Sequence, residues 1–467
     1  MLSKTDFLMY LDAPMHLWAQ SHDQLEMKGH TLFEQHLIQQ GQQVEEFARE
    51  YIENSLLDKY SQAQLFWQPS YDDGQFNIRA DALVLDKEAD VYDLYEVKSS
   101  TSVKKDHEID VTFQALLLDT ILDLRRLYIL HIDNTYLHKD TLDLAQFFLV
   151  EEITDKVEQR RAEVLELREK AFQVTQMPEP DPSFACTRPE TCPCPSLCHP
   201  GLPERPIYNL PYIGKKAVEL REMGIRAMQD IPPTFDLNIN QRKHLDAARS
   251  GQPVIDKIAI ADSLTELQYP LYFLDYETFN PAVPLFENYR PYEHIVFQYS
   301  LFVVDQPGAK PEHYDCLVTG CIDPAPQLVP DLLSHLGEVG SVIVWNKSFE
   351  AGRNRDLAVH CPTHAEQLAG INDRLYDLML IFRNGHYVHP DFQGSASLKK
   401  VLPVLCPTLD YSKLPISSGE EAMLTWYWLQ IGQISVEDQA EILENMKAYC
   451  RLDTYAMLAI LDHLREL

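Results

Sequence analysis

The sequence contains no long apolar run. No stretch reaches the ~18 consecutive apolar residues that a membrane-spanning helix needs. The first residues, MLSKTDFLMYLDAPMHLW, also lack the sustained apolar segment of a secretory signal. We therefore expect a cytoplasmic protein without a membrane partner.

Positive charge is also scarce. The chain has 40 Lys and Arg against 71 Asp and Glu, and a formal net charge of −31. This balance argues against a protein that coats nucleic acid nonspecifically. It does not exclude a nuclease, because the carboxylates that bind metal are themselves acidic. Basic residues are concentrated in two places: Lys98, Lys104, Lys105, Arg125 and Arg126, and then Lys215, Lys216, Arg221 and Arg226.

Internal repeats and low-complexity tracts are missing too. The 467 residues are too many for one hydrophobic core. Alternating helix and strand patterns occur twice, separated by a Cys- and Pro-rich stretch and a polar helical stretch. We expect an α/β protein with four segments: a first α/β domain at 1–177, a cysteine-bearing connector at 178–206, a helical module at 207–267 and a second α/β domain at 268–467.

The stretch PLYFLDYETF, residues 270–279, begins as an apolar strand and then offers two carboxylates. Asp275 and Glu277 are two residues apart, so on a strand they point to the same face. Burying both costs several kcal/mol each unless a cation neutralises them. We interpret them as ligands of Mg²⁺ or Mn²⁺, which in two-metal sites stabilise the attacking and leaving oxygens of a phosphodiester.

Two later stretches offer side chains for the same chemistry. The apolar strand at 341–345 is followed by Asn346 and Glu350. The C-terminal helical pattern carries Tyr449 and Asp453, four residues apart and therefore on one face. A phenol beside a metal-binding carboxylate can orient or deprotonate an attacking water.

The order D-x-E, N-x-x-F-E and Y-x-x-x-D resembles the DnaQ-like, or DEDD, 3′–5′ exonucleases of the ribonuclease H-like fold, in their DEDDy branch. The resemblance covers roughly residues 268–467. It departs at Glu350, where the family usually has Asp. It implies Tyr449 as a catalytic residue, Asn346 and Asp377 as supporting residues, and four metal ligands: Asp275, Glu277, Glu350 and Asp453.

A second acidic pattern lies in NIRADALVLDKEADVYDLYEVKSS. Asp81 is expected in one strand, and Glu96 and Lys98 share a face of the next. Such a carboxylate pair can hold Mg²⁺, while the ammonium group stabilises charge on a phosphate. The spacing D-x₁₄-E-x-K resembles the restriction-endonuclease-like PD-(D/E)XK nucleases, in particular their RecB-type branch.

This second resemblance implies two further site residues. Gln114 stands where RecB-type enzymes have a glutamine that contacts the site. Glu45 stands where they often carry a histidine ligand, with Glu46 as the alternative. The implied catalytic residues are Asp81, Glu96, Lys98 and Gln114, and the implied metal ligands are Glu45, Asp81 and Glu96.

The nine cysteines include no C-x₂-C pair of the kind that zinc ribbons use. Four of them lie on one proline-stiffened loop, which suits one tetrahedral metal or one cluster: Cys186, Cys192, Cys194 and Cys198. Their place after the nuclease core resembles iron–sulfur RecB-type nucleases and implies a 4Fe–4S cluster, with Zn²⁺ as the alternative. Those enzymes usually take one cysteine from an N-terminal Cys-Pro pair, where this chain has Ala13-Pro14.

The middle stretch IYNLPYIGKKAVELREMGI resembles a helix-hairpin-helix motif, in which backbone amides hold a DNA phosphate. The resemblance implies Gly214, Lys215 and Lys216 as contacts to nucleic acid. A plain helical linker is the alternative.

Together the resemblances imply a metal-dependent nuclease with two separate active sites. DNA, single-stranded or with free ends, is favoured over RNA, and the role would be in repair, recombination or defence. Two alternatives stay open: a nucleic-acid-binding scaffold with one or both sites inactive, and an RNA-processing exoribonuclease. The sequence does not indicate any protein partner.

Overall fold

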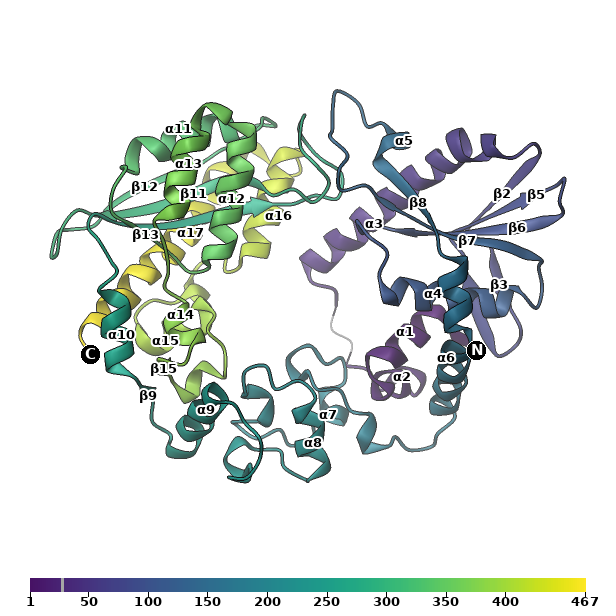
Figure 1. The fold of residues 1–467 in the computed structure, drawn as a ribbon, viewed down its shortest axis with the longest axis horizontal. Helices are drawn as coiled ribbons and strands as arrows, with labels where there is room; N and C mark the ends of the chain where they lie inside the picture. Colours follow the sequence, from purple (N-terminus) through teal and green to yellow (C-terminus); the bar gives the residue numbers. More distant parts are fainter. Residues whose placement is uncertain (27–28) are drawn as a thin grey trace. The chain divides into compact units, whose positions relative to one another are not determined.

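The computed structural model describes residues 1–26 and 29–467 (Figure 1). The chain divides into two compact units, Met1–Gly201 with Pro281–Tyr292, and Leu202–Asn280 with Glu293–Leu467. Both contain helices and β-sheets, so the expected α/β character is confirmed. The cysteine loop lies in the first unit, and the helical module lies in the second. Within the described residues, no helix has the length and apolarity needed to cross a membrane.

The first unit is built on a mixed five-stranded sheet with the order β2-β5-β6-β7-β8. Strands β2, β5 and β6 form an antiparallel meander, β7 runs parallel to β6, and β8 returns antiparallel. A smaller sheet has the order β1-β4-β3. The strands are β1 Leu2–Ser3, β2 Ala63–Trp67, β3 Ser70–Asp72, β4 Phe76–Arg79, β5 Ala82–Asp86, β6 Val91–Lys98, β7 Leu124–Ile132 and β8 Phe148–Glu152.

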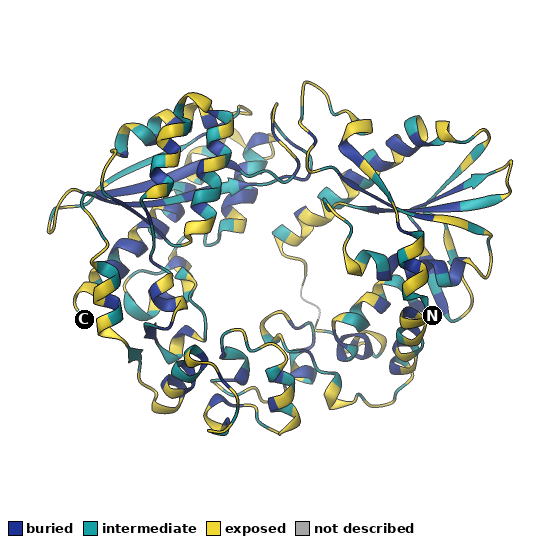
Figure 2. Cartoon of the chain, viewed as in Figure 1, coloured by how far each residue is buried: buried dark blue, intermediate teal, exposed yellow. Residues whose placement is uncertain are grey.

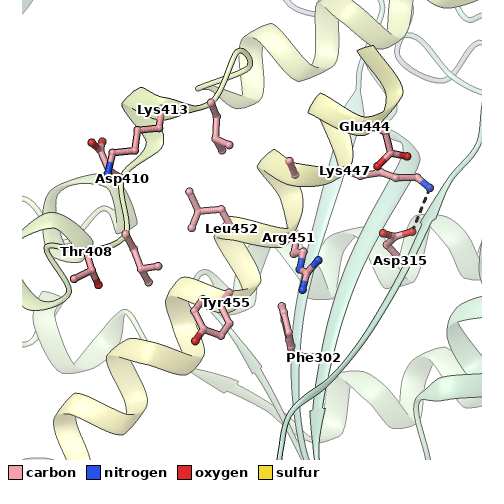
Figure 3. Close-up of a pocket in the computed structure, with 13 residues that line it drawn as sticks. Phe302, Asp315, Thr408, Asp410, Lys413, Glu444, Lys447, Arg451, Leu452 and Tyr455 are labelled. Atoms are coloured by element: carbon pink, nitrogen blue, oxygen red, sulfur yellow. Dashed lines mark ion pairs between the residues drawn. The ribbon is translucent and has the colours of Figure 1, made fainter. Parts of the chain in front are cut away.

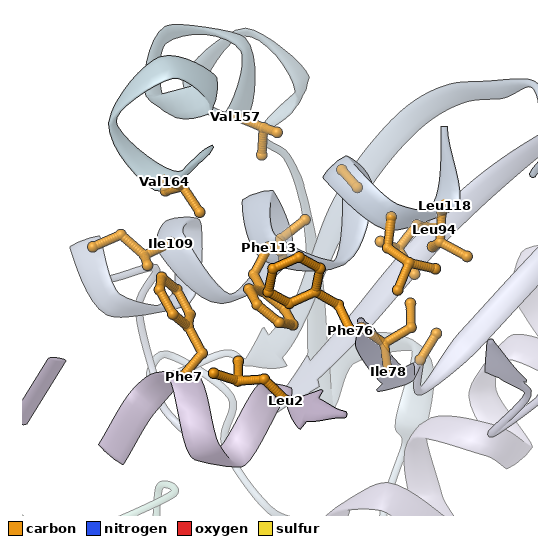
Figure 4. Close-up of a cluster of buried hydrophobic side chains, with 14 of the residues drawn as sticks. Leu2, Phe7, Phe76, Ile78, Leu94, Ile109, Phe113, Leu118, Val157 and Val164 are labelled. Atoms are coloured by element: carbon orange, nitrogen blue, oxygen red, sulfur yellow. The ribbon is translucent and has the colours of Figure 1, made fainter. Parts of the chain in front are cut away.

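Alternate residues along these strands enter two different cores, because successive side chains on a strand point to opposite faces. Leu83 joins a core with α1, α4 and α6 that contains Phe7, Phe76 and Phe113 (Figure 4). Val84 joins the other core, with α3. The helices are α1 Lys4–Asp12, α2 Pro14–Ser21, α3 Leu32–Tyr51, α4 Lys105–Leu118, α5 Leu144–Phe147, α6 Thr154–Thr175 and α7 Pro195–Cys198.

The second unit is built on a five-stranded sheet with the order β12-β11-β10-β13-β14. Strand β11 is antiparallel to β10 and β12, whereas β13 is parallel to β10 and β14. The strands are β10 Leu271–Phe279, β11 Ile295–Val304, β12 Glu312–Leu317, β13 Ser341–Val344 and β14 Leu375–Asp377, and a separate pair is β9 Val254–Ile255 with β15 Tyr387–Val388.

Helices cover both faces of this sheet, and its strands are largely buried (Figures 1 and 2). Leu274 of β10 packs in a core with α11, α12 and α13. On the opposite face, Ser300 Oγ and Thr454 Oγ1 of α17 are 2.6 Å apart. Asp275 and Glu277 alternate with Leu274 along β10, so they face α17. The helices of this layer are α11 Ala325–His335, α12 Lys347–His360, α13 Ala365–Asp373, α16 Gly419–Gln430 and α17 Val436–Arg465.

The helical module has a small core of its own, which includes Ile207, Leu220 and Leu245. Ile207–Asn209 forms only a 3₁₀ turn where a helix-hairpin-helix would have its first helix. Pro211 explains the difference, because a proline disfavours helical backbone at the residue before it. The remaining helices of the unit are α8 Lys216–Glu222, α9 Ile239–Ser250, α10 Lys257–Leu264, α14 Leu380–Arg383 and α15 Leu398–Leu405.

Candidate active sites and metal centre

The second unit gathers acidic side chains between β10 and α17. Asp275 and Glu277 leave β10 toward the helix face that carries Tyr449, Cys450 and Asp453, and these three residues are buried. Donor atoms of Asp275, Glu277 and Cys450 all lie within 4.8 Å of one another. The Cys450 thiol is 3.8 Å from Asp275 Oδ2 and donates to it.

Glu350 lies in the first turn of α12, directly after β13, and is buried. Its Oε2 has no hydrogen-bond partner in the described part of the chain. Because β10, β13 and β14 are parallel, the residues that follow them meet at one edge of the sheet. Asp377 ends β14 there, and its Oδ2 accepts a hydrogen bond of 3.1 Å from the Lys347 amide, which fixes the start of α12. Asn346 is the exposed residue that precedes α12.

A second tyrosine reaches this site. The Tyr411 hydroxyl donates to Asp453 Oδ1, and its ring is buried. Lys399 Nζ lies 5.6 Å from the Tyr411 ring centre and 5.4 Å from that of Tyr449. Tyr411 was missed in the sequence because it lies in a short 3₁₀ turn, which has no periodic pattern.

The carboxylates of this site disfavour one another's charge. Burial, followed by the charges of Asp453, Glu277 and Glu350, raises the pKa of Asp275 well above its usual value. Burial and Asp453 do the same to the pKa of Glu277, against the opposing effect of Lys399. Burial raises the pKa of Glu350 to about 8 and that of Asp453 to about 6. Lys399 near Glu277 and Asp453, and Arg353 near Glu350, therefore do not balance four carboxylates.

These residues fit a hard divalent cation. The four carboxylates offer the oxygen ligands that Mg²⁺ and Mn²⁺ prefer, and the Cys450 thiol lies among them as a donor to Asp275. The buried Glu350 Oε2 without a partner is an oxygen that such an ion would satisfy. Glu350 is near enough to Asp275 for its charge to contribute to the raised pKa of that carboxyl.

In the first unit, Glu96 is the centre of a polar network. Its Oε1 accepts from Lys98 Nζ at 2.7 Å and from Lys4 Nζ at 2.8 Å. Its Oε2 accepts from Gln114 Nε2 at 2.7 Å. The structure thus brings together Glu96, Lys98 and Gln114, and adds Lys4 from α1, a residue for which the local sequence gave no signal.

Two aspartates complete this network. Asp110 accepts from Lys98 Nζ at 2.6 Å and from Gln114 Nε2 at 3.0 Å. It precedes Gln114 by four residues on α4, a spacing that could have revealed it. Asp81 lies just before β5, and its Oδ2 accepts from the Val97 amide at 2.8 Å.

The charges in the first site are unevenly compensated. Burial opposes ionisation of Glu96, but the ammonium groups of Lys98 and Lys4 hold its pKa below its ordinary value. Burial and the Glu96 charge raise the pKa of Asp81 to about 8. A divalent cation held by Asp81 and Glu96 would offset this repulsion, although Glu96 already contacts two ammonium groups.

Glu45 reaches this network through a neighbour. The Glu45 carboxylate accepts a hydrogen bond of 3.0 Å from the side-chain Nε2 of Gln68. The backbone N–H of Gln68 donates to the backbone carbonyl of Asp81 at 2.9 Å. Glu46, its alternative, is exposed on α3.

The cysteine loop meets α2. Donor atoms of His16, Cys186, Cys192 and Cys198 all lie within 4.8 Å of one another, and all four residues are buried. The cluster could hold a metal, as zinc or as part of an iron–sulfur cluster. Cys194 is fully buried, with its Sγ 3.7 Å from that of Cys198.

The candidate nucleic-acid contacts of the helical module differ in their surroundings. Gly214 has a φ of 50°, and Lys215 is exposed beside it. Lys216 Nζ is instead held by the Asp236 carboxylate at 3.0 Å.

A pocket of about 540 Å³ runs along α17 in the second unit. Lys413 reaches it from the loop that also carries Tyr411, Arg451 and Tyr455 reach it from α17, and Phe302 reaches it from the sheet (Figure 3). The pocket thus offers aromatic rings with a mixed lining of basic and acidic side chains, in which Lys447 is paired with Asp315.

Comparison with known proteins identifies a domain but no activity. Residues 272–397 match the family model described as "Domain of unknown function (DUF2779)". The segment contains Asp275, Glu277, Glu350 and Asp377, and ends before α17.

The relatives that this chain matches carry names that state no activity. It is 27% identical over 206 residues to "Uncharacterized protein MG366 homolog" of Mycoplasma pneumoniae, which covers 40% of this chain and 31% of the relative. It is 25% identical over 231 residues to "Uncharacterized protein UU173" of Ureaplasma parvum, covering 45% and 33%. The chain thus spans about a third of the length of the curated relatives it matches. No solved structure matches it.

Proposed function

We propose that this protein is a metal-dependent nuclease that hydrolyses phosphodiester bonds in DNA. The observation that carries the proposal is the convergence of four carboxylates at one sheet edge of the second unit, with one facing lysine and a buried Glu350 oxygen that has no partner. Burying so much like charge is costly unless cations complete the site.

In the second site, Asp275, Glu277, Glu350 and Asp453 would hold Mg²⁺ or Mn²⁺. When bound, these ions would supply an activated water and stabilise charge on the phosphate. The tyrosine hydroxyls are the groups placed to orient that water. The hydroxyls of Tyr411 and Tyr449 both hydrogen-bond to Asp453. The resemblance to the DEDDy exonucleases favours Tyr449 as the group that contacts the water. The ammonium group of Lys399 moderates the negative charge on Glu277 and Asp453.

In the first site, Asp81 and Glu96 would hold a metal of the same kind. Lys98 would contact the scissile phosphate, and Gln114 and Asp110 would orient Glu96 and Lys98 through the hydrogen bonds described above. One feature of the fold supports assigning this unit to the PD-(D/E)XK nucleases: an antiparallel meander is followed by α4 and by the parallel strand β7.

The strand order of the sheet in the second unit likewise supports a ribonuclease H-like fold. Three antiparallel strands are followed by two strands parallel to the first, and the acids lie at the carboxyl edge of the parallel ones. The helical module, with Gly214 and Lys215 exposed, and the pocket beside α17 would add contacts to the nucleic-acid backbone.

The test is degradation of matched single-stranded DNA and RNA oligonucleotides by the full chain, with Mg²⁺, with Mn²⁺ and with a chelator. We expect cleavage of DNA that requires metal. In an Asp81→Ala background, which removes the first site, Glu350→Gln should lower the remaining cleavage at least ~10²-fold. The matched control is Glu441→Gln, an exposed acid on α17, which should cleave normally. Metal-independent binding without cleavage would instead indicate a scaffold, and cleavage confined to RNA would indicate an exoribonuclease; either result would overturn the proposal.

A further inference from the structure

The cysteine loop carries more donors than one tetrahedral metal can use. Four donor atoms, from His16, Cys186, Cys192 and Cys198, lie within 4.8 Å of one another. A fifth candidate, Cys194, is not a member of that group, although its Sγ is 3.7 Å from Cys198 Sγ. His199 Nε2 is 3.2 Å from Cys186 Sγ, but His199 is not a member of the group either. The distances therefore separate four donors from two other candidates, Cys194 and His199.

The spacing distinguishes a single ion from a cluster. A metal–sulfur bond of about 2.3 Å gives a tetrahedral site in which the ligand atoms are about 3.8 Å apart. In a 4Fe–4S cluster, each ligand binds a different iron atom, so the ligands are also separated by the width of the cluster. Donors that all lie within 4.8 Å leave room for one ion but not for four iron and four sulfide ions.

We propose that this loop holds a single Zn²⁺, bound by His16, Cys186, Cys192 and Cys198, and that Cys194 is not a ligand. Three thiolates and one imidazole form a common structural zinc set. The resemblance to iron–sulfur nucleases implies a cluster bound by four cysteines. The proposal differs from that expectation in the metal and in one of the four ligands, where His16 replaces Cys194.

The surroundings of His16 support its role as a ligand. His16 Nδ1 is 2.9 Å from Asp12 Oδ2, and Asp12 is itself paired with Arg188 of the cysteine loop. A carboxylate on one ring nitrogen fixes the tautomer and leaves the other nitrogen for a metal. This leaves Nε2 as the ring nitrogen that can bind the metal. Nε2 lies 3.6 Å from Cys192 Sγ.

The position of His16 also explains how the chain does without an N-terminal Cys-Pro pair. Ala13-Pro14 begins α2, and His16 lies on the first turn of that helix. The imidazole therefore supplies a ligand from the same element that would otherwise carry the cysteine. Cys194, buried beside Cys198, is placed to donate its weak S–H to a metal-bound thiolate.

The test is metal analysis of the full chain, purified anaerobically from cells supplied with both iron and zinc. We expect one zinc per chain, no acid-labile sulfide and a colourless protein. After exchange for Co²⁺, the visible absorption should show tetrahedral coordination with thiolate ligands. Iron in any form, or failure to bind zinc at all, would overturn the proposal.

Four variants test the ligand set independently of nuclease activity. His16→Ala and Cys192→Ser should release zinc to a competing chelator at least ~10-fold more readily than the wild type. Cys194→Ser is the matched control and should retain zinc as the wild type does. His16→Cys keeps a ligand in place and should also retain zinc, which separates loss of a ligand from failure to fold. Loss of the metal in Cys194→Ser, with no effect in His16→Ala, would contradict the assignment.

Discussion

Tyr449 and Asp453 lie one turn apart on α17, yet their substitutions should have different effects. Both variants are tested in an Asp81→Ala background, so that only the second site acts. Asp453→Asn keeps the shape but removes a charge that balances the metal ions, so Mn²⁺ affinity and turnover of that site should both collapse. Tyr449→Phe removes a group that contacts water, so turnover should fall by ~10²–10⁴-fold while Mn²⁺ affinity stays near that of the wild type. Calorimetric titration with Mn²⁺ and single-turnover kinetics measure the two quantities.

Glu441→Gln is the control for both variants, because Glu441 is an exposed acid on the same helix. If Tyr449→Phe and Asp453→Asn were both as active as this control, the buried face of α17 would have no part in catalysis.

Lys4 is predicted to compete with metal in the first site. Its ammonium group lies 2.8 Å from Glu96 Oε1, an oxygen that a metal would also use. Lys4→Gln removes this positive charge, so Mn²⁺ should bind the first site several-fold more tightly. The affinity is best measured in an Asp275→Ala background, which removes binding at the second site.

The matched control for Lys4 is Lys87→Gln, which changes an exposed lysine of the same unit. Weaker Mn²⁺ binding in Lys4→Gln than in this control would mean that Lys4 organises the site instead of competing with the ion.

The sequence reveals a site residue when its partner is close along the chain. Asp275 and Glu277 follow the two-residue period of a strand, and Tyr449 and Asp453 follow the four-residue period of a helix. Lys4 has no such partner, because its contact is with Glu96, far away in the sequence. His16 has Asp12 four residues before it, but the cysteine that it meets, Cys192, is far away in the sequence.

The segment at 408–414 connects the acidic site with the pocket along α17. Tyr411 points to Asp453, whereas Lys413 lines the pocket. Lys413→Ala should therefore raise KM for an oligonucleotide several-fold and weaken its salt dependence, since one phosphate contact is lost, while kcat changes little. The kinetics are compared at two or more salt concentrations.

Lys310→Ala, an exposed lysine between β11 and β12, is the control for this variant. A fall in kcat with an unchanged KM in Lys413→Ala would place Lys413 in the chemical step and not in substrate binding.

Helices and strands with strong periodic patterns are predictable, and short irregular elements are not. The apolar strand β10 and the long helix α17 both lie where the sequence predicts them. The segment before Pro211 looks helical from its composition, but its backbone makes only the 3₁₀ turn Ile207–Asn209. The charged amphipathic pattern of residues 151–175 predicts a helix over that whole range, but α6 begins at Thr154, because Phe148–Glu152 is used by the sheet as β8.

In the whole molecule, the metal centre should stabilise one unit and not the other. The cysteine loop and α2 belong to the first unit, and the cores of the two units are separate. Cys192→Ser should lower the unfolding temperature of the first unit by more than about 5 °C, since 1 kcal/mol corresponds to about 2–4 °C in a unit of this size. Calorimetry resolves the two transitions, and Cys194→Ser is the control. An equal shift of both transitions would contradict a local stabilising role.

The central claim is that the protein is a nuclease with two independent metal-dependent sites. The most direct measurement is the degradation pattern of 5′- and 3′-labelled single-stranded DNA, cut by the wild type, Asp81→Ala, Asp275→Ala and the double variant in Mg²⁺ or Mn²⁺. We predict that each single variant loses one pattern of products and keeps the other, and that the double variant loses both. Absence of metal-dependent cleavage by the wild type, or loss of all cleavage in a folded single variant, would contradict the account.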